Sequence, residues 1–136
     1  MEFHWTILLL AFLWLLFCEA EGYIDARHMD RPGSSRQTAL PELVMFKVGL
    51  HIFPLVAGYM LGGWQLALGM FLTRPAIHHG RYFLISSFID PRKGQRTYWN
   101  KPNRVNPFER RFYAPDVRKG MLIIGGAFIA WATFAA

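Results

Sequence analysis

Apolar residues gather in three long runs, and polar residues fill the two segments between them. The runs cover residues 3–20, 44–73 and 119–136. A helix needs about 17–25 predominantly apolar residues to cross a bilayer, and each run reaches that range. The pattern therefore predicts a single membrane domain: an all-α integral membrane protein with three transmembrane helices.

The first run, within residues 1–20, has two interpretations. A secretory signal peptide has an apolar core and a small-residue cleavage site, and residues 18–20 fit such a site. Its start, however, has no Lys or Arg and contains the acidic Glu2. We therefore favour an uncleaved membrane anchor, with Trp5 at one interface. If the run were a signal peptide, two crossings would remain.

The second run has one face of small or polar residues and one of bulky apolar residues when it is read at helical spacing. The small or polar face comprises Lys47, His51, Pro54, Gly58, Gly62, Gln65 and Gly69. Small residues let helix backbones approach closely, and the amide of Gln65 needs a partner inside a membrane. In the third run, Gly126, Ala130 and Thr133 form a similar stripe. These positions predict packing against other helices.

The polar segment 21–43 is expected to be a surface loop, and Pro41 suits a helix start. A continuous helix from there to residue 73 would be about 50 Å long at 1.5 Å per residue, whereas the hydrocarbon core is about 30 Å thick. We expect this helix either to project from the membrane or to bend near Gly49 and Pro54.

Charge is divided unevenly along the chain, whose net charge is +6. Residues 1–73 carry a net charge of −2 and residues 74–136 a net charge of +8. Most of the positive charge lies in the expected loop 74–118, where basic and aromatic residues alternate. The residues expected to dock on anionic lipid, such as cardiolipin, or on an acidic subunit are Arg74, His78, Arg81, Arg92, Lys93, Arg96, Trp99, Arg110 and Arg111.

Nucleic acid is not expected as a partner, because this basic loop is tethered between two membrane segments. Short basic loops accumulate on the cytoplasmic, matrix or stromal side. With three crossings, this rule places the N-terminus on the same side as loop 74–118. The C-terminus is then expected on the opposite side.

Candidate chemistry is sparse. His51 is an ionisable group in a membrane segment, so it is a candidate haem or pigment ligand, a proton relay, or a hydrogen-bond partner of another helix. The face formed by Lys47, His51 and Gln65 would suit a small transporter or channel component. The sequence has no HExxH or CxxC motif and no phosphate-binding loop, and its single cysteine excludes an intrachain disulfide. We predict a non-enzyme that binds no metal and no cofactor other than phospholipid.

In general character, with short apolar helices and a basic, aromatic-rich segment, the chain resembles the small accessory subunits of energy-converting membrane complexes. The resemblance implies a role in assembly or stability alongside other membrane subunits. It also implies a mitochondrial inner membrane setting, in the respiratory chain or ATP synthase, with the basic loop on the matrix side. A thylakoid or another cell membrane is the alternative.

Overall fold

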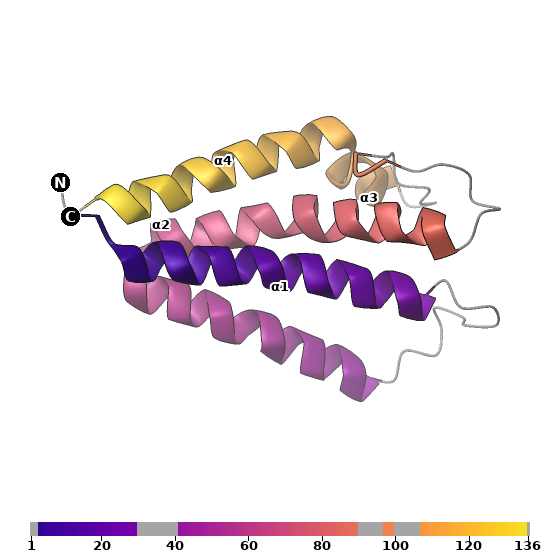
Figure 1. The fold of residues 1–136 in the computed structure, drawn as a ribbon, viewed down its shortest axis with the longest axis horizontal. Coiled ribbons are helices and arrows are strands. Elements are labelled where there is room, and N and C mark those ends of the chain that lie inside the picture. Colours follow the sequence, from indigo (N-terminus) through magenta and orange to yellow (C-terminus); the bar gives the residue numbers. More distant parts are fainter. Residues whose placement is uncertain (1–2, 30–40, 90–96, 100–106, 136) are drawn as a thin grey trace.

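The structure, a computed structural model, describes residues 3–29, 41–89, 97–99 and 107–135. These residues form four helices and no strand (Figure 1). Three of the helices are long and apolar enough to cross a membrane, which confirms the predicted all-α fold with three candidate spans. The helices are α1 (Trp5–Met29), α2 (Pro41–Ile89), α3 (Pro107–Phe112) and α4 (Pro115–Phe134).

Helix α2 folds back on itself at Gly63. This residue has φ 69° and ψ −169°, in the region that favours glycine because it has no Cβ. Residues 41–62, the first arm, run in one direction, and residues 64–89, the second arm, return beside them (Figure 1). The expected bend near Gly49 and Pro54 is therefore in the wrong place, since the backbone stays helical at both residues.

The helices extend beyond the predicted apolar runs. Helix α1 continues to Met29 and α2 continues to Ile89, so residues 21–29 and 74–89 are helical where loops were expected. The physical reason is that acidic side chains of the first extension pair with basic side chains of the second, as described below. Because these charges are paired within the protein, the two segments can remain helical and need not form loops in water.

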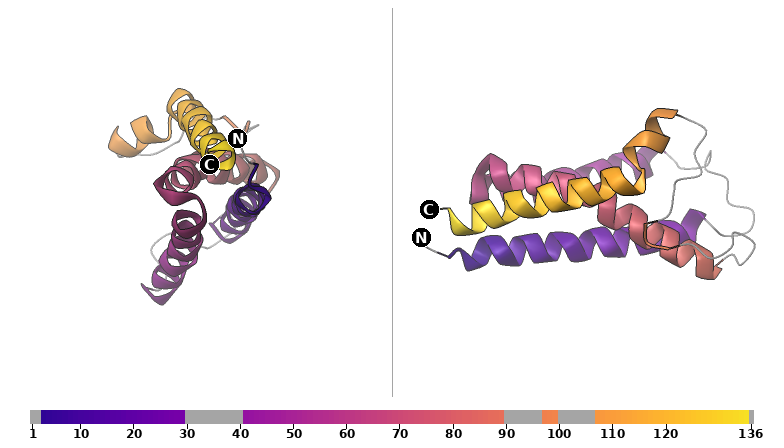
Figure 2. Two further views of the ribbon diagram at one scale, coloured as in Figure 1. Left: turned by 90° about the vertical axis from the view of Figure 1, so that its left-hand side faces the viewer. Right: turned by 90° about the horizontal axis from the view of Figure 1, so that it is seen from above.

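Both ends of the chain lie at the same end of the molecule (Figures 1 and 2). The backbone N–H of His4 donates to the carbonyl oxygen of Thr133 at 3.1 Å, and the rings of Phe3 and Phe134 are 5.2 Å apart. The sequence led us to expect the termini on opposite sides. The reversal at Gly63 adds a change of direction that the prediction lacked.

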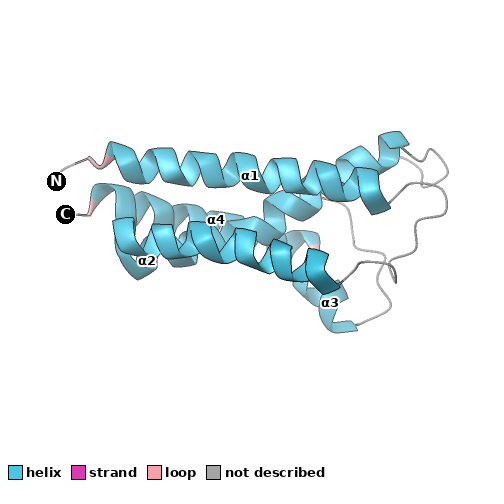
Figure 3. Ribbon diagram, turned by 90° about the horizontal axis from the view of Figure 1, so that it is seen from below, coloured by secondary structure: helices cyan, strands magenta, loops and turns pink. Residues whose placement is uncertain are grey.

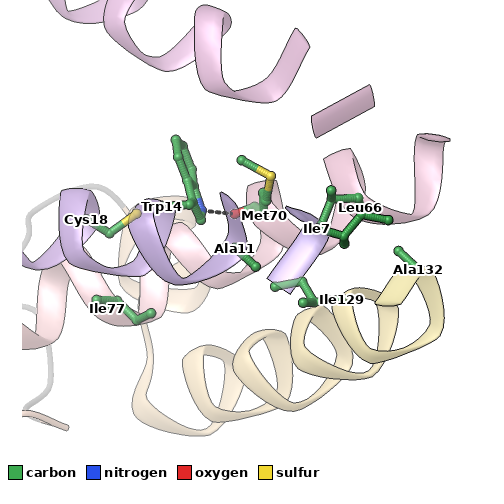
Figure 4. Packing of buried hydrophobic residues seen from close by; sticks show 9 residues of the cluster. All are labelled: Ile7, Ala11, Trp14, Cys18, Leu66, Met70, Ile77, Ile129 and Ala132. Atoms are coloured by element: carbon green, nitrogen blue, oxygen red, sulfur yellow. Dashed lines mark hydrogen bonds between the residues drawn. The ribbon is translucent and has the colours of Figure 1, made fainter. Parts of the chain in front are cut away.

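Helix α2 is the central element, because it packs against both α1 and α4 (Figures 2 and 3). Its second arm contacts α1 at Met70 and α4 at Gly69. One apolar core joins the three, with the indole N–H of Trp14 donating to the carbonyl oxygen of Met70 at 2.7 Å (Figure 4). This bond satisfies the only polar atom of the buried Trp14 side chain. The buried core residues are Ile7, Ala11, Trp14, Cys18, Leu66, Met70, Ile77, Ile129 and Ala132.

Candidate functional site

Acidic side chains of α1 meet basic side chains of α2 at the end of the molecule away from the termini. We call these residues the charged network: Glu19, Glu21, Asp25, His51, Arg74, His78 and Arg81. On α1, about 21 Å of helix separates Trp5 from Glu19, and about 30 Å separates Trp5 from Asp25, at 1.5 Å per residue. If Trp5 marks one interface, the network spans the far third of a hydrocarbon core about 30 Å thick.

Glu21 joins α1 to both arms of α2. Its Oε2 lies 2.8 Å from Nε2 of His51, on the first arm, and its Oε1 accepts a hydrogen bond from Nη2 of Arg74, on the second arm, at 3.1 Å. The Glu21 side chain is only 10% exposed. A buried carboxylate is costly unless it is paired and hydrogen-bonded, so these contacts hold the two arms together around it.

Asp25 begins a second line of contacts, one turn further along α1. Its Oδ2 lies 2.9 Å from Nε2 of His78, and Nδ1 of His78 lies 3.4 Å from Nδ1 of His79. The His79 ring stacks on Tyr113, with centroids 3.8 Å apart and planes 21° apart. The helices can approach here because of Gly22, where an added Cβ would lie 2.5 Å from the carbonyl oxygen of His78.

Glu19 connects the network to the short described segment 97–99. Arg81 donates from Nε to its Oε2, and the hydroxyl of Tyr98 donates to its Oε1 at 2.9 Å. Burial, followed by the hydrogen bond to Glu19, raises the pKa of Tyr98 above its ordinary value. The Tyr98 ring covers Gly80, where an added Cβ would clash with ring carbons. A glycine on α2 therefore makes room for Tyr98.

Arg118, near the start of α4, is fully buried beside this segment. Its Nη2 donates at 2.8 Å both to the carbonyl oxygen of Ala76 and to that of Tyr98. Its guanidinium carbon lies 5.0 Å from the Trp99 ring centroid and 5.6 Å from that of Phe83. Hydrogen bonds from Nη2 and the aromatic faces offset part of the cost of burying this cation, while its Nε and Nη1 are buried without a hydrogen-bond partner among the described residues.

The predicted docking residues divide into four groups. Arg74, His78 and Arg81 lie on α2 and pair with acids of α1, because carboxylates of the same chain lie within reach. Their docking on lipid or on another subunit stays a prediction. Trp99 lies against Arg118, as above. Arg110 and Arg111 are exposed on α3, whereas Arg92, Lys93 and Arg96 lie outside the described residues.

The predicted packing glycines of α2 make their packing contacts within the chain. An added Cβ at Gly58 would lie 2.7 Å from Sδ of Met70, on the other arm, and one at Gly62 would lie 2.7 Å from Leu66. Gly69 packs on α4. Gln65 follows the reversal, so it does not share a continuous helix face with His51, and the side chain of Lys47 is not described.

On α4, Gly126 and Ala130 point away from the other described helices. No atom of the described chain lies within 4 Å of a Cβ added at Gly126, and Ala130 is exposed. The preceding residue, Gly125, is buried against α2 instead. Two residues of the predicted small-residue stripe are therefore on the outer surface of the molecule, whereas the third, Thr133, is buried.

Sequence reasoning missed the acidic half of the network and Arg118. A signal for the acids was present: Glu21 and Asp25 are four residues apart, as are Arg74 and His78, so each pair lies on one helix face. Complementary charges at the ends of two apolar runs indicate pairing between them. Arg118 and Tyr98 gave no comparable signal.

Comparison with known protein families, with curated proteins and with solved structures finds no match to this chain.

Proposed function

We propose that the protein is a non-catalytic accessory subunit of a larger membrane complex, in which it contributes to assembly, stability and lipid contact. The observation that carries the proposal is the outward face of α4. Gly126 and Ala130 are four residues apart, the spacing at which small residues allow close packing of membrane helices. This face does not pack against the other described helices. It therefore suits a helix of another subunit.

The small interior of the molecule gives further support. In the second and third candidate spans, only 22% of the most apolar window is buried within the chain. On the first arm of α2, Phe53 and Met60 are 79% and 80% exposed. A transporter or channel acting alone needs an interior large enough to enclose a pathway. These spans instead offer most of their surface to lipid and to neighbouring helices.

The proposed setting is the mitochondrial inner membrane, in a respiratory-chain complex or ATP synthase, with a thylakoid membrane as the alternative. The support is the net charge of +8 over residues 74–136, since positive charge accumulates on the matrix or stromal side. Arg110 and Arg111 lie at the end of the molecule away from the termini. They would contact cardiolipin or another anionic lipid on the matrix side.

Two other functions rank behind this one. A transport role for the Lys47, His51 and Gln65 face loses support because the reversal at Gly63 separates Gln65 from the other two. A haem or pigment role for His51 loses support because its Nε2 already contacts Oε2 of Glu21 at 2.8 Å. A visible absorbance that His51→Ala abolishes would revive the second of these.

The test is native gel electrophoresis of gently solubilised source membranes, followed by mass spectrometry of the band that contains this chain. We expect comigration with a large hetero-oligomer. Gly126→Leu is expected to release the chain from that band, because leucine would hold the partner helix away. Gly120→Leu is the matched control, since an added Cβ there also meets nothing within 4 Å and the position lies on another side of α4. Migration of the wild type as a monomer would contradict the proposal.

A further inference from the structure

Three groups of the charged network come close enough to share one ion. One ligand atom from each of Glu21, Asp25 and His78 lies within 4.8 Å of the other two. Glu21 and Asp25 are one helical turn apart on α1, and His78 faces them from the second arm of α2. From this geometry we propose that the protein binds one divalent first-row transition-metal ion, of the Zn²⁺ or Fe²⁺ class, between α1 and α2.

The donor set fits that class. Imidazole nitrogen and carboxylate oxygen together suit zinc, iron and manganese, whereas calcium and magnesium prefer oxygen ligands alone. Metal–ligand bonds of about 2.0–2.2 Å place neighbouring donor atoms about 3 Å apart. Nε2 of His78 and Oδ2 of Asp25 are already 2.9 Å apart, so a modest movement of Glu21 completes the triad.

Charge and burial also fit. Two carboxylates, one of them paired with Arg74, leave one negative charge to attract a cation, and Glu21 and His78 are both buried. Arg74 holds Oε1 of Glu21 and His51 contacts Oε2, but a carboxylate oxygen has a second lone pair for a metal. Three protein ligands leave at least one coordination position for water or another small ligand.

Metal binding requires one tautomer of His78, which the neighbouring histidine can stabilise. To bind the ion, Nε2 of His78 must offer its lone pair, so the single proton of the neutral ring must lie on Nδ1 and none is lost to solvent. Nε2 lies 2.9 Å from Oδ2 of Asp25, and Nδ1 lies 3.4 Å from Nδ1 of His79, which can accept that proton in a hydrogen bond. A hydrogen bond from the other ring nitrogen is the usual way to fix a metal-binding histidine.

The test uses the full chain in detergent micelles, with any affinity tag removed and metal stripped by a chelator. Co²⁺ is the probe, because its visible d–d absorption reports nitrogen and oxygen coordination, and Zn²⁺ is the competitor. We expect saturable one-to-one binding that Zn²⁺ displaces and millimolar Mg²⁺ does not. Asp25→Asn and His78→Gln are each expected to lower the affinity about tenfold or more.

The matched control is His4→Gln, which changes a histidine at the other end of the molecule and is expected to leave Co²⁺ binding unchanged. Asp25→Asn preserves the shape of the side chain and can keep its contact with His78. This variant therefore still tests the site if His78→Gln fails to fold. Absence of saturable Co²⁺ binding by the wild type would overturn the proposal. So would affinity that Asp25→Asn leaves unchanged, or that His4→Gln lowers equally.

Discussion

Gly69 on α2 and Gly125 on α4 face each other so closely that neither has room for a side chain. A Cβ added at Gly69 would lie 2.8 Å from the carbonyl oxygen of Gly125, and one added at Gly125 would lie 2.9 Å from that of Gly69. The obstacle is backbone in both directions, which cannot move aside as a flexible side chain can. This contact sets the separation of the two helices and explains why both positions are glycine.

Gly125→Ala is therefore expected to destabilise the protein by about 1–2 kcal/mol, since overpacking outweighs the gain in helix propensity. Thermal unfolding in detergent micelles, followed by circular dichroism, measures the change. The adjacent Gly126→Ala is the control. It meets no atom within 4 Å and is expected to leave stability unchanged or slightly raised. Equal stability of the two variants would contradict the close approach.

Glu21 and Arg74 are expected to be energetically coupled. Their side chains are 10% and 28% exposed, so solvent screens their attraction only in part. Removing one member of a buried pair typically costs about 3–5 kcal/mol, and we expect Glu21→Leu to fall near the lower end of that range. The double variant Glu21→Leu/Arg74→Leu should lose less than the sum of the single losses.

A double-mutant cycle on the free energy of unfolding measures this coupling, which we expect to be about 1–3 kcal/mol. The pair Glu21 and Arg110 is the control, because Arg110 lies on α3, whereas the ion pairs of Glu21 are with His51 and Arg74 on α2. Additive effects of the Glu21 and Arg74 substitutions would show that this ion pair does not join α1 to the second arm.

Tyr98 is expected to hold its proton more tightly in the folded protein than in the unfolded chain. Burial and the hydrogen bond to Glu19 raise its pKa above the ordinary value of about 10. Its stabilising effect is thus fully present below pH 10 and is lost as the pH rises through the folded-state pKa. Tyrosinate absorbance near 295 nm, compared between wild type and Tyr98→Phe, measures this titration. A Tyr98 signal that titrates near pH 10 in the folded protein would contradict the contact with Glu19.

The sequence was sufficient to predict the helical class and the candidate spans, because long apolar runs admit few other structures. The reversal of α2 could not be predicted in the same way. Gly63 lies next to Gly62 inside an apolar run, and glycine is frequent in membrane helices that stay straight. Tertiary contacts, such as those of the two arms with Glu21 and that of Gly58 with Met70, distinguish a hairpin from one long helix.

The charged network was hidden for a related reason. Basic residues such as Arg74 and His78 follow an apolar run, which is also where residues that contact lipid headgroups are found. Their pairing with Glu21 and Asp25 depends on α1 and the second arm lying side by side and continuing past their apolar runs as helices. The polar composition of residues 21–43 and 74–118 led us to expect loops there instead.

The most direct test of the structural account is the membrane topology of the chain. Single cysteines at residues 3, 97 and 135, in a Cys18→Ala background, would be labelled with a membrane-impermeant maleimide in sealed, oriented vesicles. Since α2 reverses at Gly63, we predict that positions 3 and 135 are labelled from one side and position 97 from the other. Labelling of positions 3 and 135 from opposite sides would show that α2 crosses only once and would contradict the hairpin.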